Sequence, residues 1–203
     1  EYKHKLSFYT SAQHVDRNSY YGAQQDPNAF GKTKDLTFVG GGMYVGNFDK
    51  VLFSPATFTA GLEYSHNNMH DIMAGYNRDL EQKVRIASAF FQNEWKMNDF
   101  TLLAGFRLDD HNLIENLIFS PRVNLLYKPS DALQGRLTWS TGFRAPQAYD
   151  EDLHITAVGG EGVLIHLEDG LKPEKSNSFS GSVDLSGQIG HFQTNLLIEG
   201  FYT

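Results

Sequence analysis

Cysteine is absent from the 203 residues of this chain, so disulfides, zinc–thiolate sites and cysteine nucleophiles are excluded. Long hydrophobic runs are absent as well, and the purely apolar stretches are only a few residues long. Because a transmembrane helix needs about 20 mostly apolar residues, no such helix is expected. Strands that cross a membrane are not excluded, since only every second residue of such a strand has to be apolar.

Basic residues are in the minority. The chain has 17 Lys and Arg against 24 Asp and Glu, and its formal net charge is −7. Because phosphate binding needs a basic surface, nucleic acid is not expected as a partner. No phosphate-binding loop and no dinucleotide-binding glycine motif occurs. The composition, with 40 % hydrophobic and 20 % charged residues, is that of a folded chain rather than a disordered one.

Apolar and polar residues alternate along most of the chain, whereas helical periodicity is hard to find. In the segment 100–109, for example, Phe100, Leu102 and Phe106 fall on one face of an extended strand, and Arg107 and Asp109 fall on the other. The pattern predicts an all-β fold with nine strands, at about 2–17, 35–47, 51–66, 83–97, 100–111, 116–128, 132–144, 176–189 and 192–203.

The connections between these strands alternate in length. Tight turns are expected at 48–50, 98–99, 129–131 and 190–191, and long loops at 18–34, 67–82 and 145–175. Short turns on one rim and long loops on the other are typical of an antiparallel up-and-down outer-membrane barrel. Across the turn at 98–99 paired residue numbers sum to 197, which places Ser88 on the same face as Asp109. The sequence therefore predicts a meander with one apolar and one polar face.

The same alternation would suit a soluble β-sandwich or a lipocalin-like barrel, in which the apolar face is the core. Strands of about 11–16 residues, long against the usual five or six, favour the membrane. Aromatic residues near the strand ends, such as Trp95, Phe100 and Tyr127, favour it too, since aromatic girdles mark both membrane interfaces. The predicted membrane-facing residues are Phe58, Leu62, Phe91, Trp95, Phe100, Leu102, Phe106, Phe119, Val123, Leu125, Leu137, Trp139, Leu196 and Ile198.

The polar face is predicted to line the interior of the barrel, where charged residues pair with one another or with a plug. It carries Glu63, Glu94, Arg107, Arg122, Arg136, Arg144 and Glu199. Nine strands cannot close a barrel here, because the number is odd and both outer strands would be unpaired edges in lipid. Residues 1–203 are therefore expected to be a segment of a larger barrel domain.

Three segments carry a resemblance to a known family. Residues 85–95 and 102–110 read RIASAFFQNEW and LLAGFRLDD, with a tight turn between them. Residues 140–146 read STGFRAP, and residues 171–178 read LKPEKSNS. In this order they resemble the "YxQdEW … GxRxD" hairpin, the "GFRAP" strand end and the "LkPEkS" strand start of TonB-dependent outer-membrane receptors. The resemblance covers about 50–203 well and the first 50 residues only generally.

The resemblance implies a barrel of about 22 strands in the cell outer membrane of a Gram-negative bacterium, with a plug domain inside it. It implies TonB-powered uptake of a scarce ligand such as an iron–siderophore complex, haem or cobalamin. The partners would be the TonB complex, reached through the plug, a small-molecule or metal-complex ligand, and outer-membrane lipids. The plug and the remaining strands are expected outside 1–203. The alternative is a soluble or surface-exposed β-rich binding module without transport activity.

The loop 145–175 supplies the first candidate site. Loops longer than about 12–15 residues are usually functional or disordered, and this one carries Tyr149, Asp152, His154 and His166, which we predict to contact the ligand. Haem receptors of the family carry a histidine between a "FRAP" box and an "NPNL" box, but the second box reads EDGL at 168–171 here. The alternative is a lid that only shields the pore.

A second candidate lies in the predicted loop around 66–73. His66, Met69 and His70 offer imidazole and thioether groups, which suit soft metals such as copper, although a polar loop with an incidental methionine would read the same. No spacing of Ser, His and an acid indicates a catalytic triad. The sequence therefore predicts neither an enzyme nor a cofactor.

Overall fold

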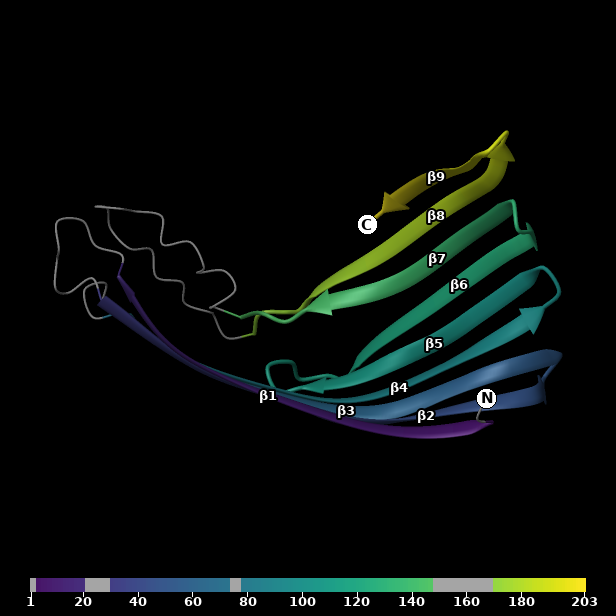
Figure 1. Cartoon of the computed structure of the whole chain (residues 1–203). Coiled ribbons are helices and arrows are strands. Elements are labelled where there is room, and N and C mark those ends of the chain that lie inside the picture. The colour runs from purple at the N-terminus through teal and green to yellow at the C-terminus, as the bar shows by residue number, and fades with distance from the viewer. Residues whose placement is uncertain (1–2, 21–29, 74–77, 148–169) are drawn as a thin grey trace.

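The computed structural model describes residues 3–20, 30–73, 78–147 and 170–203, which form one curved antiparallel sheet (Figure 1). Within these ranges there is no helix, and hence none long and apolar enough to cross a membrane. The nine strands are β1 (His4–Tyr20), β2 (Phe30–Val51), β3 (Ser54–Met73), β4 (Arg78–Met97), β5 (Phe100–His111), β6 (Ile118–Ser130), β7 (Leu133–Arg144), β8 (Glu174–Ile189) and β9 (Phe192–Tyr202).

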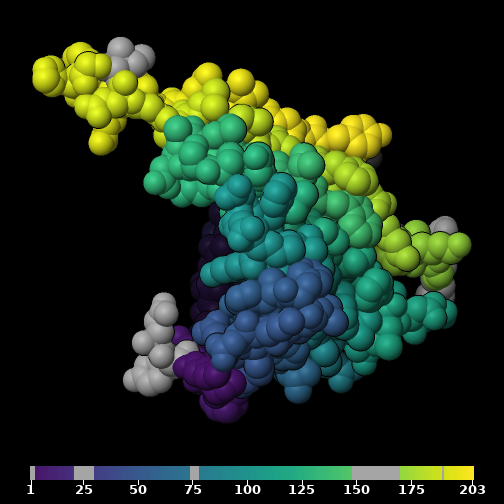
Figure 2. Space-filling model, turned by 90° about the vertical axis from the view of Figure 1, so that its right-hand side faces the viewer, coloured from purple at the N-terminus to yellow at the C-terminus, as the bar shows by residue number. Residues whose placement is uncertain are grey.

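Each strand pairs with its neighbours in sequence, in the order β1 to β9, so the predicted meander is confirmed. β1 runs toward the rim that carries the long connections, as predicted. The order is linear, and within the described residues β1 and β9 are not neighbours. Seen from the rim with the tight turns, the strands follow one another around an open arc (Figure 2).

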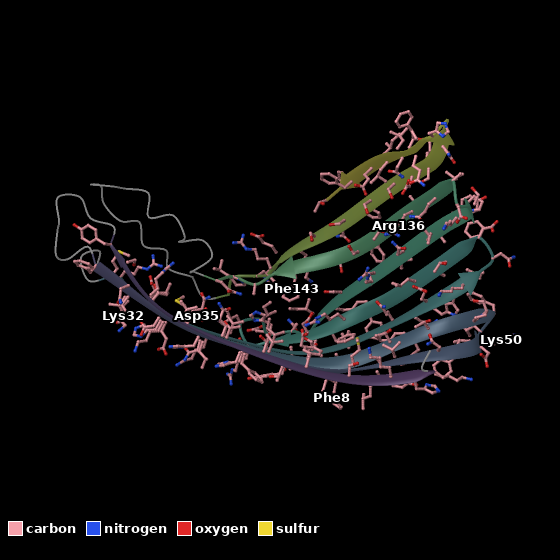
Figure 3. All side chains as sticks on the ribbon, viewed as in Figure 1. Phe8, Lys32, Asp35, Lys50, Arg136 and Phe143 are labelled. Atoms are coloured by element: carbon pink, nitrogen blue, oxygen red, sulfur yellow. The ribbon has the colours of Figure 1, made fainter. Side chains whose placement is uncertain are left out.

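The registers place every predicted membrane-facing residue on one face of the sheet. Phe58 lies opposite Asn93, Leu102 lies opposite Trp95 and Leu125, and the same parity continues through all nine strands. Phe8 belongs to this face and lies on the convex side of the sheet (Figure 3). The apolar face is therefore convex, and the face with Glu63 and Arg107 is concave.

The convex face is exposed rather than packed. Phe8 is 78 % exposed, Leu62 67 % and Leu137 63 %. Apolar residues that are buried among the described residues are few: Ala56, Met69, Met73, Val84, Ile118 and Ala145. A soluble sandwich would bury such a face, and contiguous apolar surface of this extent marks contact with a membrane or a partner. The exposure therefore favours the membrane interpretation over the soluble one.

The four N-terminal strands are longer than predicted. β2, β3 and β4 contain 22, 20 and 20 residues and pass beyond β5, which has 12 (Figure 1). Residues 30–34, 67–73 and 78–82, predicted as loops, are strands, and the loop prediction for 66–73 is wrong. This extension shows no regular apolar alternation, because polar residues such as Lys32, Lys34 and His70 lie on its convex face between Phe30 and Ile72. Its backbone ladder and inward-facing polar contacts hold it instead.

The turns confirm the predicted faces of the strands, but not every turn lies at its predicted position. The register across 98–99 is the predicted one, and Asn98 there has φ of 47°. The turn predicted at 48–50 lies instead at 52–53, because the register shifts between Phe48 and Val51. Leu52 at that turn has φ of 62°. The parity survives the shift, so the apolar and polar faces are unaffected.

Aromatic residues gather at the tight-turn rim as predicted. Phe53 stacks on Trp95 with ring centroids 5.8 Å apart, and Phe100 stacks on Tyr127 at 4.6 Å. Aromatic rings at this level are typical of a membrane interface, where an apolar ring body meets the polar headgroup layer. We name the apolar residues of the convex face between the two rims the apolar belt. The two aromatic pairs mark the end of this belt at the tight-turn rim.

Candidate functional site

The concave face carries one continuous polar row across five strands. Tyr9 of β1 lies opposite Gly41, Gly41 opposite Glu63, Glu63 opposite Ser88, and Ser88 opposite Asp109. Side chains of one row share a face, so these groups can contact one another directly. The Tyr9 hydroxyl donates a hydrogen bond to Glu63 Oε2 at 2.6 Å, across the glycine that separates their strands.

Arg107, the next concave residue on β5, connects the members of this row. Its Nη2 donates to Glu63 Oε1 at 2.8 Å and to Ser88 Oγ at 2.6 Å. Its Nε donates to Asp109 Oδ1 at 2.7 Å, and Ser88 donates to the same oxygen at 2.6 Å. One guanidinium thus donates to two carboxylates and a hydroxyl through N–H groups that its planar fork holds in fixed directions.

Because these side chains are partly or fully buried, the ion pairs of Arg107 with Glu63 and Asp109 matter for stability. The Asp109 side chain is 3 % exposed, Glu63 24 % and Arg107 38 %. A buried charge is costly unless it is paired and hydrogen-bonded, so Asp109 depends on the donors from Arg107 and Ser88. The row therefore holds β1, β3, β4 and β5 in one register through polar contacts rather than through an apolar core.

A second polar network lies in the extension, on the same concave face. Arg78 Nε lies 2.7 Å from Asp71 Oδ2, with both side chains less than 8 % exposed. Thr33 donates to Asp71 Oδ1 at 2.5 Å, and Arg17 Nη2 donates to Thr33 at 3.1 Å. Four strands are tied together here, at the level where the apolar alternation has ended. These contacts explain why the extension forms strands despite its polar sequence.

The end of β7 and the residues that follow it separate from β6 and cross the concave side of the sheet. Pairing between β6 and β7 begins only at Arg122 and Ser140, although β7 continues to Arg144. Phe143 contacts the ring of His111 on β5, with centroids 6.3 Å apart. Gln82 Nε2 on β4 donates to Gln147 Oε1 at 3.2 Å. Residues 143–147 therefore contact β5 at His111 and reach β4 at Gln82, near the long-loop rim.

Other charged residues of the concave face remain open to a ligand or partner. Arg122 and Arg136 are exposed, and within the described part of the chain neither forms an ion pair. Guanidinium groups of this kind bind carboxylate and phosphate oxygens in a bidentate way. The face can thus hold an anionic or strongly polar molecule. No group of three or more His, Asp or Glu suited to a metal occurs among the described residues.

Four predicted site residues, Tyr149, Asp152, His154 and His166, lie outside the described residues. His66, Met69 and His70 all lie on β3, but they do not converge. Met69 is 3 % exposed and faces the concave side, whereas His66 and His70 face the convex side. His70 Nε2 contacts Asp79 Oδ1 at 2.7 Å. A metal site that uses the two histidines stays a prediction, and Met69 faces away from it.

Sequence reasoning identified Glu63 and Arg107 as interior residues but not as partners. Their numbers differ by 44, and only the registers of two strand pairs, β3–β4 and β4–β5, bring them together. The network around Asp71 and Arg78 was missed because both residues were placed in a predicted loop. Strand parity carried far enough along β3 and β4 would have found them, since Glu63 and Asp71 share one parity.

Comparisons with known proteins agree with this architecture. The family model described as "TonB dependent receptor-like, beta-barrel" matches residues 1–203. The siderophore receptor PirA from Acinetobacter baumannii has 18 % identity and a TM-score of 0.65, over 96 % of this chain and 31 % of that one. PirA from Pseudomonas aeruginosa has 15 % identity and a TM-score of 0.64, over 92 % and 38 %.

The ferric enterobactin receptor PfeA from Pseudomonas aeruginosa, solved as a mutant with enterobactin, has 20 % identity and a TM-score of 0.58, over 90 % and 30 %. No curated protein matches the chain significantly. At these identities the structural likeness shows the fold alone. The chain spans about a third of the length of the solved receptors that it resembles.

Proposed function

Because this chain belongs to the TonB-dependent receptor-like β-barrel family, we propose that it forms part of an outer-membrane receptor that imports a scarce ligand with TonB-derived energy. The observation that carries the proposal is the division of the sheet into an apolar convex face and a concave face with paired and unpaired charges. A membrane barrel needs lipid-compatible residues outside and tolerates charges only inside. A soluble binding module would bury an apolar surface of this kind rather than expose it.

The ligand that we favour is an iron–siderophore complex, with haem and cobalamin as the alternatives within the same mechanism. The resemblance to two siderophore receptors and to a ferric enterobactin receptor supports this choice. The open guanidinium groups of Arg122 and Arg136 also suit an anionic or oxygen-rich ligand, because arginine binds such oxygens in pairs.

Residues 1–203 would then be one segment of a barrel domain that further strands close. Strands β1 and β9 each need a partner in lipid, because an unpaired edge exposes backbone groups that hydrocarbon cannot satisfy. In this proposal a plug domain elsewhere in the receptor fills the interior and contacts the TonB complex. The receptor would lie in the outer membrane, with its long loops outside the cell.

We further propose that Tyr149, Asp152, His154 and His166 contact the ligand at the outer mouth. The support is the path of residues 143–147, which lead the chain from β7 across the concave side to Gln82 on β4. A loop that starts across the mouth is well placed to meet a molecule that enters it. The alternative role, a lid without ligand contacts, makes a different prediction in the experiment below.

The experiment uses the full-length receptor in a Gram-negative strain that lacks its other iron receptors, with uptake of radiolabelled ferric siderophores as the readout. We expect uptake that disappears when TonB is deleted. Uptake that continues without TonB would contradict the transport proposal. Alanine at the four loop positions should lower binding of the transported complex, whereas Lys128→Ala, at the tight-turn rim, is the matched control. Unchanged binding in the fourfold variant would eliminate the contact role alone.

A further inference from the structure

A proline explains why the long-loop end of β7 separates from β6. Pairing between the two strands ends at Arg122 and Ser140, and the next residue of β6 is Pro121. The N–H of Lys128 points to β5, where it donates to the Asp99 carbonyl oxygen. Because backbone groups alternate sides along an antiparallel strand, the nitrogen of Pro121 points to β7 instead. Proline has no N–H to donate there, so the ladder stops.

The freed end of β7 lies on the concave face as an extended segment. We name residues 143–147 the crossing segment. Its odd-numbered residues face the sheet, since Phe143 contacts the His111 ring and Ala145 is 6 % exposed. On the paired part of β7, residues of this parity, such as Trp139, lie on the convex face. The same face of the strand thus turns from the membrane side to the interior once β7 has left β6.

His111 is a buried titratable group under the crossing segment. It is 2 % exposed, and its ring meets that of Phe143, at the end of β7, edge to face at 6.3 Å (Figure 3). Its Nδ1 lies 3.1 Å from the backbone nitrogen of Leu113, which can only donate. Nδ1 is therefore the accepting nitrogen of a neutral imidazole. The ring contacts both the turn after β5 and the crossing segment.

The turn after β5 has other bonds that hold it. The N–H of Ile114 donates to the His111 carbonyl oxygen at 2.9 Å. The Asn112 side chain accepts from the Arg85 N–H at 2.7 Å and donates to the Lys83 carbonyl oxygen at 2.9 Å. These bonds anchor the turn to β4 whatever the state of the imidazole. A change at the ring therefore acts chiefly on the crossing segment.

The carboxylate nearest to His111 on β5 is already neutralised. Asp109 lies two residues earlier on the same face, and its Oδ1 accepts from Arg107 Nε at 2.7 Å and from Ser88 Oγ at 2.6 Å. Arg107 also pairs with Glu63, so both carboxylates of this network share one cation. Donors that already hold the Asp109 carboxylate reduce the support that it gives to an imidazolium.

The other strands around His111 present apolar groups at this level. Ile86 of β4 lies directly opposite it, Ile118 is buried at the start of β6, and β7 contributes the Phe143 ring. Arg144 follows on β7 with the opposite parity and is exposed. Protonation of the ring would bury a charge among these apolar groups. It would also turn Nδ1 into a donor that faces the N–H it now accepts from.

We propose that His111 is a positioning residue whose neutral imidazole holds the crossing segment on the concave face, and whose protonation releases this segment. Histidine is the side chain whose ordinary titration falls between about pH 5 and 8, so an acidic medium outside the cell acts on it. The direction follows from the contacts, because the neutral ring has its acceptor satisfied and the charged ring is buried without a partner. This inference goes beyond uptake and depends neither on the ligand nor on TonB.

The test follows a nitroxide spin label attached at Gln147→Cys in the full-length receptor, with any cysteine outside residues 1–203 replaced. Its EPR spectrum should show an immobilised label at about pH 7.5 and a severalfold larger mobile component at about pH 5. His111→Asn keeps an acceptor near the position of Nδ1 but cannot be protonated, so its label should stay immobilised at both pH values. His14→Asn is the matched control, because His14 lies on the convex face opposite Leu36. It should respond as the wild type does.

A second measurement needs no substitution. Hydrogen exchange of the Leu113 amide, corrected for the intrinsic effect of pH, should become severalfold faster at about pH 5, because the protonated ring no longer accepts from it. The Ile114 amide donates to a carbonyl oxygen instead, so it is the internal reference and should change less.

Three results would overturn the proposal. A label that is equally immobilised at both pH values in the wild-type background would show that protonation does not release the crossing segment. A full pH response in His111→Asn would assign the response to another group. Corrected exchange of the Leu113 amide that does not depend on pH would show that the imidazole keeps its contact in acid.

Discussion

Tyr9 and Glu63 form a hydrogen bond of 2.6 Å although β2 separates their strands, because the residue between them is Gly41. A Cβ atom at Gly41 would lie 2.6 Å from the Tyr9 ring and 2.8 Å from the Leu62 carbonyl oxygen. The missing side chain lets the tyrosine ring lie flat across β2. The first strand is thereby connected to the Glu63–Arg107 pair of the third and fifth.

Gly41→Ala should therefore destabilise the protein. The added methyl group must displace the Tyr9 ring or the backbone, and overpacking of this kind costs about 1–3 kcal/mol. Urea unfolding of the full-length receptor in lipid vesicles measures the loss. Gly135→Ala is the control, because the nearest atom to its Cβ is 4.0 Å away. Equal stability of the two variants would contradict the role assigned to Gly41.

Arg107→Ala should cost more than the loss of one hydrogen bond. It leaves Asp109, 3 % exposed, with only the Ser88 hydroxyl, and it leaves Glu63 with only Tyr9. Breaking a fully buried pair costs about 3–5 kcal/mol, and because Arg107 is partly exposed we expect about 2–3 kcal/mol. Adding Asp109→Asn should recover part of the stability. If the double variant is no better than the single one, the buried charge is not the cause.

The two faces can be distinguished by adjacent residues of one strand. Ala104→Arg places a charge on the convex face, opposite Asn93 and Val123 and inside the aromatic boundary, and should destabilise by about 2 kcal/mol, between the cost at the interface and the cost at the bilayer midplane. Leu103→Arg, one residue along, faces the concave side opposite Asn124 and should cost much less. Refolding yield and urea unfolding in vesicles compare the two. A larger loss at Leu103 would reverse the assignment of faces.

Asn93 is an unusual residue of the convex face, and replacing it with an apolar residue should increase the stability of the receptor. It is 2 % exposed, lies opposite Phe58 and Ala104, and neither its oxygen nor its nitrogen has a hydrogen-bond partner in the described structure. An unsatisfied buried polar group costs about 1–3 kcal/mol, so Asn93→Leu should stabilise the receptor by up to that amount. Asn124→Leu should destabilise it instead, because Asn124 donates to Thr138.

The path of residues 143–147 can be tested in a chain that has no cysteine of its own. Gln82→Cys combined with Gln147→Cys should react with a short bifunctional thiol reagent, since the two amides lie 3.2 Å apart. Gln82→Cys with Gln134→Cys, at the other end of β7, should not react. Mobility on a denaturing gel reports the cross-link. Cross-linking of both pairs, or of neither, would contradict the crossing.

Much of the fold could be predicted because strand faces are a local property. Alternation with period two places Phe91 and Trp95 on one side and Ser88 and Glu94 on the other, whatever lies beside the strand. A tight turn then transmits the parity to the next strand, as it does across 98–99. The number, order and faces of the strands therefore followed from the sequence alone.

The ends of strands β1 to β4 and the side-chain contacts on the concave face did not follow from the sequence. Beyond the apolar belt, Asp71 and Arg78 follow no hydrophobic period, and their strand conformation depends on contacts with each other and with Thr33. Tyr9, Glu63 and Arg107 meet only because several registers add up across strands far apart in sequence. Such distances are properties of the assembled sheet, and for that reason the tertiary structure alone decided them.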